Sequence, residues 1–117
     1  MDQTEHREIC KEMLTLRELL DTMHIDWTDD SDQITEDRIA FNNCYIYRTH
    51  FNYNGDEYSV IYGFGTYGGW GRWLNKEDPK LLELMVNNEA PTGYHTAADI
   101  IWIMNERQCE RGGRNVE

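Results

Sequence analysis

Residues 44–64 read CYIYRTHFNYNGDEYSVIYGF, and this stretch decides the fold. Asn54-Gly55 separates two runs rich in aromatic and β-branched residues. A two-residue hairpin turn favours Asn-Gly because both central residues need positive φ, so the stretch predicts a β-hairpin. With such a turn the predicted cross-strand pairs are Phe51 with Tyr58, Thr49 with Val60, Tyr47 with Tyr62, and Tyr45 with Phe64.

The two sides of the predicted ribbon differ in chemistry. One side is aromatic and apolar. Antiparallel sheets commonly pack one face on a core and leave the other in water, so we expect the aromatic side to lie under helices. The other side, which we expect to be at least partly wet, carries Ile46, Arg48, His50, Glu57, Ser59 and Ile61.

A helical pattern precedes the hairpin. Apolar residues recur there at steps of four, three, four and three: Ile9, Met13, Leu16, Leu20 and Met23. These steps place them on one face of a helix of about five turns, which Asp2 or Thr4 could cap. We expect this face to pack on the core. The alternative is a dimeric coiled-coil seam, so a homodimer stays open.

The chain between this helix and the hairpin is polar and acidic. Ile25 and Trp27 alternate with acids and predict a short strand, which runs into TDDSDQITED, a predicted solvated loop. Residues 38–41 predict another short strand, with Asn42-Asn43 as a turn.

Glycine and proline divide the chain after the hairpin. GFGTYGGWGRW, residues 63–73, holds five glycines and predicts an exposed, shaped loop. Asp78-Pro79 predicts the start of a helix over 80–88, since Asp is a good N-cap and Pro suits the first helical position. Thr96 and Asp99 resemble a capping box that opens a further helix. Its predicted buried face holds Ala97, Ile100, Ile101 and Met104.

These elements predict the α+β class in a chain of 117 residues. We expect one domain over 1–108, with 109–117 as a flexible tail. Its architecture would be a small antiparallel sheet with a central β-hairpin, packed on one face by an N-terminal helix and two C-terminal helices.

The formal charge of −11 is unevenly distributed. Residues 18–37 contain eight acids and no Lys or Arg, so this segment contributes −8. Such a field disfavours direct binding of nucleic acid or an anionic membrane and attracts basic protein surfaces. The predicted partner-binding acids are Asp26, Asp29, Asp30, Asp32, Glu36 and Asp37. Simple solvation of these acids is the alternative interpretation.

Aromatic residues beside an arginine make the glycine-rich stretch a second candidate surface. Tyr67, Trp70, Arg72 and Trp73 would anchor a partner, since exposed aromatics next to Arg are typical of recognition surfaces. The alternative is that the tryptophans fold onto the core. The same stretch matches GxGxxG, but Trp70 and Trp73 interrupt the helix that a dinucleotide fold needs. A nucleotide sponge, the alternative function, would use Arg48, His50, Gly65, Gly68, Gly69 and Arg72.

No other motif predicts chemistry. We expect no cofactor and no metal, because His6, Cys10, Cys44 and His50 would need distant segments to converge into a zinc site. No nucleophile spacing indicates an enzyme. Three cysteines without CxxC spacing fit reduced thiols, and no segment predicts secretion or membrane insertion, so we expect a cytoplasmic protein.

Residues 24–104 carry a resemblance. The motifs VIYGFGTYGG, LLELM and PTGYHTAADII, in this order, resemble those of small uncharacterised proteins of prophages and mobile elements in Gram-positive gut bacteria. This resemblance implies a phage or mobile-element accessory role in the host cytoplasm. In size and acidity alone the chain is also similar to anti-CRISPR and anti-restriction proteins. The leading hypothesis is a non-enzymatic inhibitor that binds a basic host protein, such as a nucleic-acid-handling defence effector, by mimicking nucleic acid.

Overall fold

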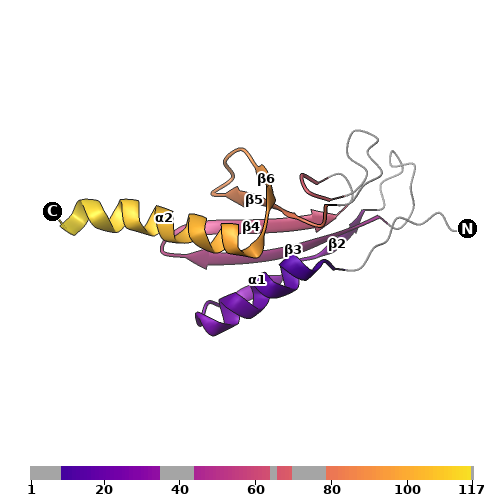
Figure 1. Cartoon of the computed structure of the whole chain (residues 1–117), viewed down its shortest axis with the longest axis horizontal. Coiled ribbons are helices and arrows are strands. Elements are labelled where there is room, and N and C mark those ends of the chain that lie inside the picture. The colour runs from indigo at the N-terminus through magenta and orange to yellow at the C-terminus, as the bar shows by residue number, and fades with distance from the viewer. Residues whose placement is uncertain (1–8, 35–43, 64–65, 70–78, 117) are drawn as a thin grey trace, which may run out of the picture.

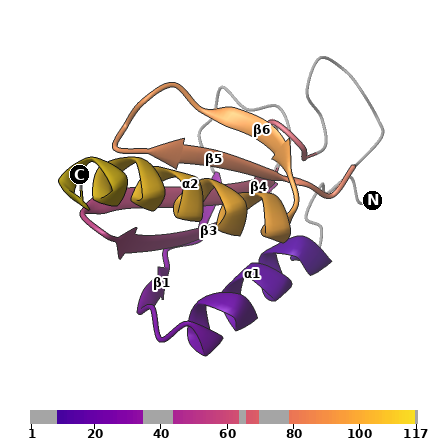
Figure 2. The ribbon, with the colours of Figure 1, turned by 60° about the vertical axis from the view of Figure 1, so that its left-hand side comes forward.

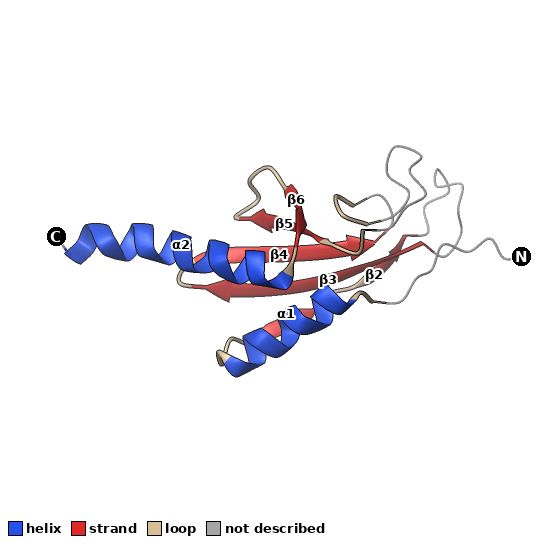
Figure 3. Cartoon of the chain, in the orientation of Figure 1, coloured by secondary structure: helices blue, strands red, loops and turns tan. Residues whose placement is uncertain are grey.

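The computed structural model describes residues 9–34, 44–63, 66–69 and 79–116. Figure 1 shows an antiparallel sheet with two helices, and Figure 3 colours the same view by element type. The elements in chain order are α1 (Lys11–Thr22), β1 (Trp27–Asp29), β2 (Asp32–Ile34), β3 (Cys44–Tyr53), β4 (Asp56–Gly63), β5 (Leu82–Val86), β6 (Thr92–His95) and α2 (Ala97–Val116). The α+β class is confirmed.

The sheet is built around the β3–β4 hairpin. Its strand order is β1-β3-β4-β5-β6, and β2 pairs with β3 beyond the end of β1. Asn54 and Gly55 take φ values of 53° and 88°, as the predicted turn requires. Three of the predicted pairs are confirmed: Tyr47 with Tyr62, Thr49 with Val60 and Phe51 with Tyr58. The fourth includes Phe64, which lies outside the described residues.

One face of the sheet is closed by the two helices, whose apolar residues join those of β3, β4 and β5 in one buried cluster. Figure 2 shows α2 in front of β4 and β5, with α1 below it. The aromatic side of the hairpin supplies this face, and its rings stack across the strands, with 4.9 Å between the centroids of Phe51 and Tyr58. The buried residues of the core come from α1, β3, β4, β5 and α2. They include Met13, Leu16, Leu20, Phe51, Tyr58, Val60, Tyr62, Leu82, Leu84, Ile100 and Met104.

Helix α1 is shorter than the sequence pattern predicts. It begins at Lys11, and its N-cap residue, Cys10, makes no side-chain capping hydrogen bond. Met13, Leu16 and Leu20 are buried as predicted. Asp2 and Thr4, the predicted caps, lie outside the described residues.

The predicted helix over 80–88 is wrong, because this segment forms β5. Leu82, Leu84 and Val86 alternate inward and pack under the helices. Four of its five residues, 83–86, pair with β4, whose outer edge would otherwise leave its backbone groups without strand partners. Asn87 and Asn88 take positive φ and end the strand. The sheet is therefore covered by one N-terminal and one C-terminal helix, not by three helices.

The acidic segment is more regular than predicted. β1 confirms the strand expected at Trp27, but the following stretch, predicted as a loop, includes β2. β1 and β2 together pair with most of the length of β3. The strand predicted over 38–41 and the turn at Asn42-Asn43 lie outside the described residues.

The capping box at the start of α2 is confirmed. The backbone N–H of Thr96 donates to Asp99 Oδ2 at 2.9 Å, and the N–H of Asp99 donates to Thr96 Oγ1 at 3.1 Å. The helix then continues to Val116, so its backbone passes through the boundary predicted at 108–109. Whether residues 109–117 move separately stays a prediction. Within the described residues, neither helix is long and apolar enough to cross a membrane.

A buried acid joins the hairpin tip to α2. Asp56 is 1% exposed; its carboxylate accepts from Arg107 Nε at 3.0 Å and from Asn87 Nδ2 at 2.8 Å. The hydrogen bond with Asp56 raises the pKa of Arg107. Tyr53 also donates its hydroxyl to Gln108. These polar contacts hold the middle of α2 against the turn of the hairpin.

Candidate binding site on the open face of the sheet

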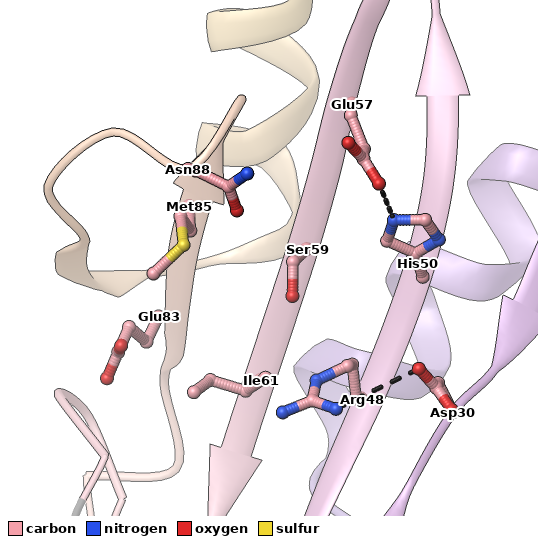
Figure 4. Close-up of a pocket in the computed structure, with 9 residues that line it drawn as sticks. All are labelled: Asp30, Arg48, His50, Glu57, Ser59, Ile61, Glu83, Met85 and Asn88. Atoms are coloured by element: carbon pink, nitrogen blue, oxygen red, sulfur yellow. Dashed lines mark hydrogen bonds and ion pairs between the residues drawn. The ribbon is translucent and has the colours of Figure 1, made fainter.

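No helix covers the other face of the sheet, as far as the described residues extend, and the mixed side of the hairpin lies there. A hollow of ≈ 310 Å³ opens on this face (Figure 4). Cross-strand pairing places six of its lining residues in two rows across β3, β4 and β5. The rows are His50–Ser59–Met85 and Arg48–Ile61–Glu83, and Asp30, Glu57 and Asn88 complete the lining.

The short side chain of Ser59 explains where the hollow lies. Ser59 stands in the middle strand, directly between His50 and Met85. Neighbouring side chains on one sheet face lie within contact distance of each other. A short side chain among long ones therefore leaves a depression in the surface at its own position. Ile61 and Met85 add apolar surface to this polar setting.

The two basic residues of the hollow, Arg48 and His50, are each paired with an acid. Arg48 lies 3.8 Å from Asp30, and His50 Nε2 lies 2.7 Å from Glu57 Oε2. The side chains of Arg48 and Asp30 are 37% and 65% exposed, so their ion pair is a weak surface contact. His50 was a predicted ligand-binding residue together with Arg48, and the structure brings the two together on one wall.

The opposite wall carries Glu83. Its Oε1 accepts from the backbone N–H of Tyr67 at 2.7 Å. Among the described residues, no cationic side chain pairs with this half-buried carboxylate. Glu83 and Met85 were not predicted as site residues, because they lay in the segment interpreted as a helix. The inward alternation of Leu82, Leu84 and Val86 is the signal that would have placed them on the open face.

The predicted acidic surface divides between the two faces. In β1, Trp27 and Asp29 lie opposite Phe51 and Thr49, which belong to the covered face. Asp30 instead lines the hollow. Asp26 is exposed before β1. Of the other predicted acids, Asp32 lies in β2, and Glu36 and Asp37 lie outside the described residues.

Asp29 is engaged by α1 and by the next turn. Arg17 NH2 lies 3.3 Å from Asp29, and the same arginine donates from Nε to Thr49 Oγ1 at 2.7 Å. Its guanidinium also covers the Trp27 ring, with 4.8 Å to the centroid. The pKa of Asp29 is lowered, chiefly by the hydrogen bond from the Ser31 hydroxyl, with a smaller contribution from Arg17. Asp29 therefore serves the α1–β1 contact as well as the surface charge.

The described part of the glycine-rich stretch is packed, not exposed as predicted. Thr66, Gly68 and Gly69 are buried, and Thr66 Oγ1 accepts from the N–H of Gly63 at 3.0 Å. A Cβ placed on Gly69 would lie 2.0 Å from the Gly63 carbonyl oxygen. Gly68 has φ +106°, and its carbonyl accepts from the N–H of Leu81 at 3.0 Å. These glycines permit a tight turn against β5, so they offer no open phosphate cradle.

Tyr67 is the only member of the predicted aromatic anchor among the described residues. It is half-buried, and a Cβ placed on Gly93 would lie 2.0 Å from Tyr67 Cβ, so the tyrosine packs against β6. Its hydrogen bond to Glu83 places it next to the hollow. Trp70, Arg72, Trp73 and Gly65 lie outside the described residues.

The described part of the chain contains no group of three or more His, Cys, Asp or Glu arranged to hold a metal ion. Cys10 is buried in the core, and Cys109 is exposed on α2.

Comparison of the chain with models of protein families, with curated proteins and with solved structures finds no match.

Proposed function

We propose that this protein is a non-enzymatic acidic binding protein that holds a basic protein surface against the open face of its sheet. The observation that carries the proposal is the hollow, where three carboxylates stand around one arginine and one histidine on the uncovered face. With neutral His50 the lining has a net charge of −2, from Asp30, Glu57 and Glu83 against Arg48.

The acidic segment extends this surface. Asp30 belongs both to the segment and to the hollow, so the segment reaches the open face at this residue. Asp26, Asp29, Asp32, Glu36 and Asp37 would then add long-range attraction, which raises encounter rates and weakens with salt. Tyr67 lies beside this face, and Trp70, Arg72 and Trp73 would extend the anchor.

We infer the class of partner from the negative charge of the protein together with its sequence resemblance. A basic groove that normally holds nucleic acid would accept an acidic protein as a mimic. Such a partner, a nucleic-acid-handling defence effector in the host cytoplasm, fits the phage or mobile-element role that the resemblance implies. The proposal assigns no cofactor and no catalytic residue.

The test neutralises two acids of the open face without removing a buried contact. Asp30→Asn with Glu57→Gln should weaken binding of a fluorescent nona-arginine peptide by roughly tenfold at low salt, since exposed charge pairs contribute about 0.2–1 kcal/mol each. Glu18→Gln with Glu106→Gln is the matched control, because it removes the same charge from exposed positions on the two helices. Equal losses in the two double variants, or binding that salt does not affect, would contradict the proposal.

A nucleotide sponge remains the second candidate, because Arg48 and His50 line the same hollow. Three carboxylates oppose a phosphate there, and the Gly68–Gly69 turn is packed. Thermal denaturation with cyclic and linear nucleotides separates the two functions, since a ligand that binds only the folded state raises the melting temperature.

A further inference from the structure

Glu83 differs from the other ionisable residues of the hollow. Arg48 pairs with Asp30, and His50 pairs with Glu57, whereas Glu83 accepts only a backbone N–H among the described residues. A half-buried carboxylate is stabilised by an opposite charge within about 4–6 Å. Within the described part of the chain, the hollow therefore keeps one carboxylate without an opposite charge, on its β5 side.

Apolar surface lies next to this carboxylate. Ile61 is the direct cross-strand neighbour of Glu83, and Met85 follows two residues along β5 on the same face. Figure 4 shows Met85 on β5 and Ile61 on β4, both on the β5 side of Ser59. Arg and Lys combine a charged head with an aliphatic stem that packs on apolar surface, and Met adapts to such stems. An inorganic cation would use neither side chain.

The size of the hollow limits what can enter. A volume of ≈ 310 Å³ is at the lower end of the range for small-molecule sites, which begins at about 300 Å³. Such a space suits one side chain better than a nucleotide with its base, sugar and phosphates. The excess of carboxylates also favours a cation over an anion.

We infer that the hollow is the receptor for one arginine or lysine side chain of the basic partner, with the charged head at Glu83 and the stem over Ile61 and Met85. This inference rests on the proposed function and names the contact that gives it specificity. Ser59 provides the space that the side chain enters, and Tyr67 holds the Glu83 carboxylate in place through its backbone N–H.

The experiment titrates the full chain, labelled with ¹⁵N, with Nα-acetyl-arginine amide. Backbone amides of Ser59, Ile61, Glu83 and Met85 should shift, and Nα-acetyl-citrulline amide, which has the same shape without the charge, should bind at least about tenfold more weakly. Glu83→Gln should weaken the arginine amide by about tenfold, since the Gln oxygen can still accept from Tyr67 while the charge is gone. Ser59→Leu should fill the hollow and abolish the shifts. Glu106→Gln should leave them unchanged.

Three results would overturn the inference. Equal shifts with the citrulline amide would show that charge is not recognised. Shifts that persist in both Glu83→Gln and Ser59→Leu would place the ligand elsewhere. Spermidine that binds the hollow more tightly than the arginine amide would assign it to a free polyamine instead of a protein side chain.

The nona-arginine peptide separates this inference from the proposed function. If the Asp30/Glu57 double variant weakens the peptide but Glu83→Gln and Ser59→Leu do not, the acidic face binds basic protein without a receptor hollow. If none of these variants weakens the peptide more than the Glu18/Glu106 control, the proposed function itself fails.

Discussion

The covered and open faces of the sheet place acids in opposite settings. On the covered side, Asp56 is buried and accepts hydrogen bonds from Arg107 and Asn87. On the open side, Asp30 is 65% exposed and meets Arg48 only at 3.8 Å. Residues of the same type thus contribute stability on one face and available charge on the other. The comparison separates the part of the molecule that holds the fold from the part that we propose meets a partner.

The largest expected effect compares two neighbouring residues of β3. Phe51→Ala should lower the free energy of unfolding by about 3–5 kcal/mol, because it leaves a cavity beside Tyr58 and the helices. Asn52→Ala, one position along and exposed, should change it by less than about 0.5 kcal/mol. Urea denaturation measures both. Similar losses would mean that the open face is packed as tightly as the covered one.

A second pair compares the acids themselves. Asp56→Ala should destabilise the protein by about 3 kcal/mol, since Arg107 and Asn87 lose their buried acceptor. Asp30→Ala should cost no more than about 1 kcal/mol, as exposed ion pairs do. Thermal and urea unfolding of both variants test this. If Asp30→Ala destabilises the protein as much as Asp56→Ala, the proposed difference between the two faces is wrong.

The glycine turn provides a third, smaller test. Gly69→Ala should destabilise by about 1–3 kcal/mol, because its Cβ would meet the Gly63 carbonyl and the turn must shift. Gly55→Ala serves as a comparison at an exposed turn, where only positive φ is strained. If urea denaturation shows that Gly69→Ala leaves the free energy of unfolding unchanged, the packed turn is contradicted. The prediction of an open loop would then hold.

The smallest effect concerns the pKa of Asp29. Ser31→Ala removes the main cause of its lowering, so the pKa should rise toward the ordinary value of 3.8. Because the folded pKa is lowered, the stability from Asp29 is present above 3.8 and is lost as the pH falls through the folded pKa. Ser31→Ala should therefore reduce the amount of unfolding free energy that the protein loses as the pH falls below about 4. NMR titration of the Asp29 carboxyl carbon checks the shift, with Ser59→Ala as the control; an unmoved pKa would contradict the assigned cause.

The elements that could be predicted are those with local causes. The Asn54-Gly55 turn needs only two residues that accept positive φ, and the alternation around it sets the register of the flanking strands. The Thr96–Asp99 capping box is likewise a contact within four residues. Of the site, this local pattern placed Arg48, His50, Glu57, Ser59 and Ile61 on a common face.

The predictions that proved wrong concern segments whose local structure depends on contacts with segments far away in the sequence. The apolar run at 81–86 is short enough to fit a helix or a strand, and the free edge of β4 selects the strand. Glu83 reached the hollow only through that pairing. The charge pattern predicts one acidic surface, but pairing of β1 with β3 places Asp29 next to Arg17.

The sequence by itself determined the hairpin, its register, the wet and dry sides of its strands, the capped start of α2 and the excess of negative charge. These depend on turn chemistry, period-two alternation and composition, which act over a few residues or need no structure at all. Only the tertiary structure decided that β5 joins the sheet, that the glycines form a packed turn and that Glu83 lines a hollow together with Arg48. Those features depend on hydrogen bonds and packing between segments far apart in the chain, and no local pattern contains them.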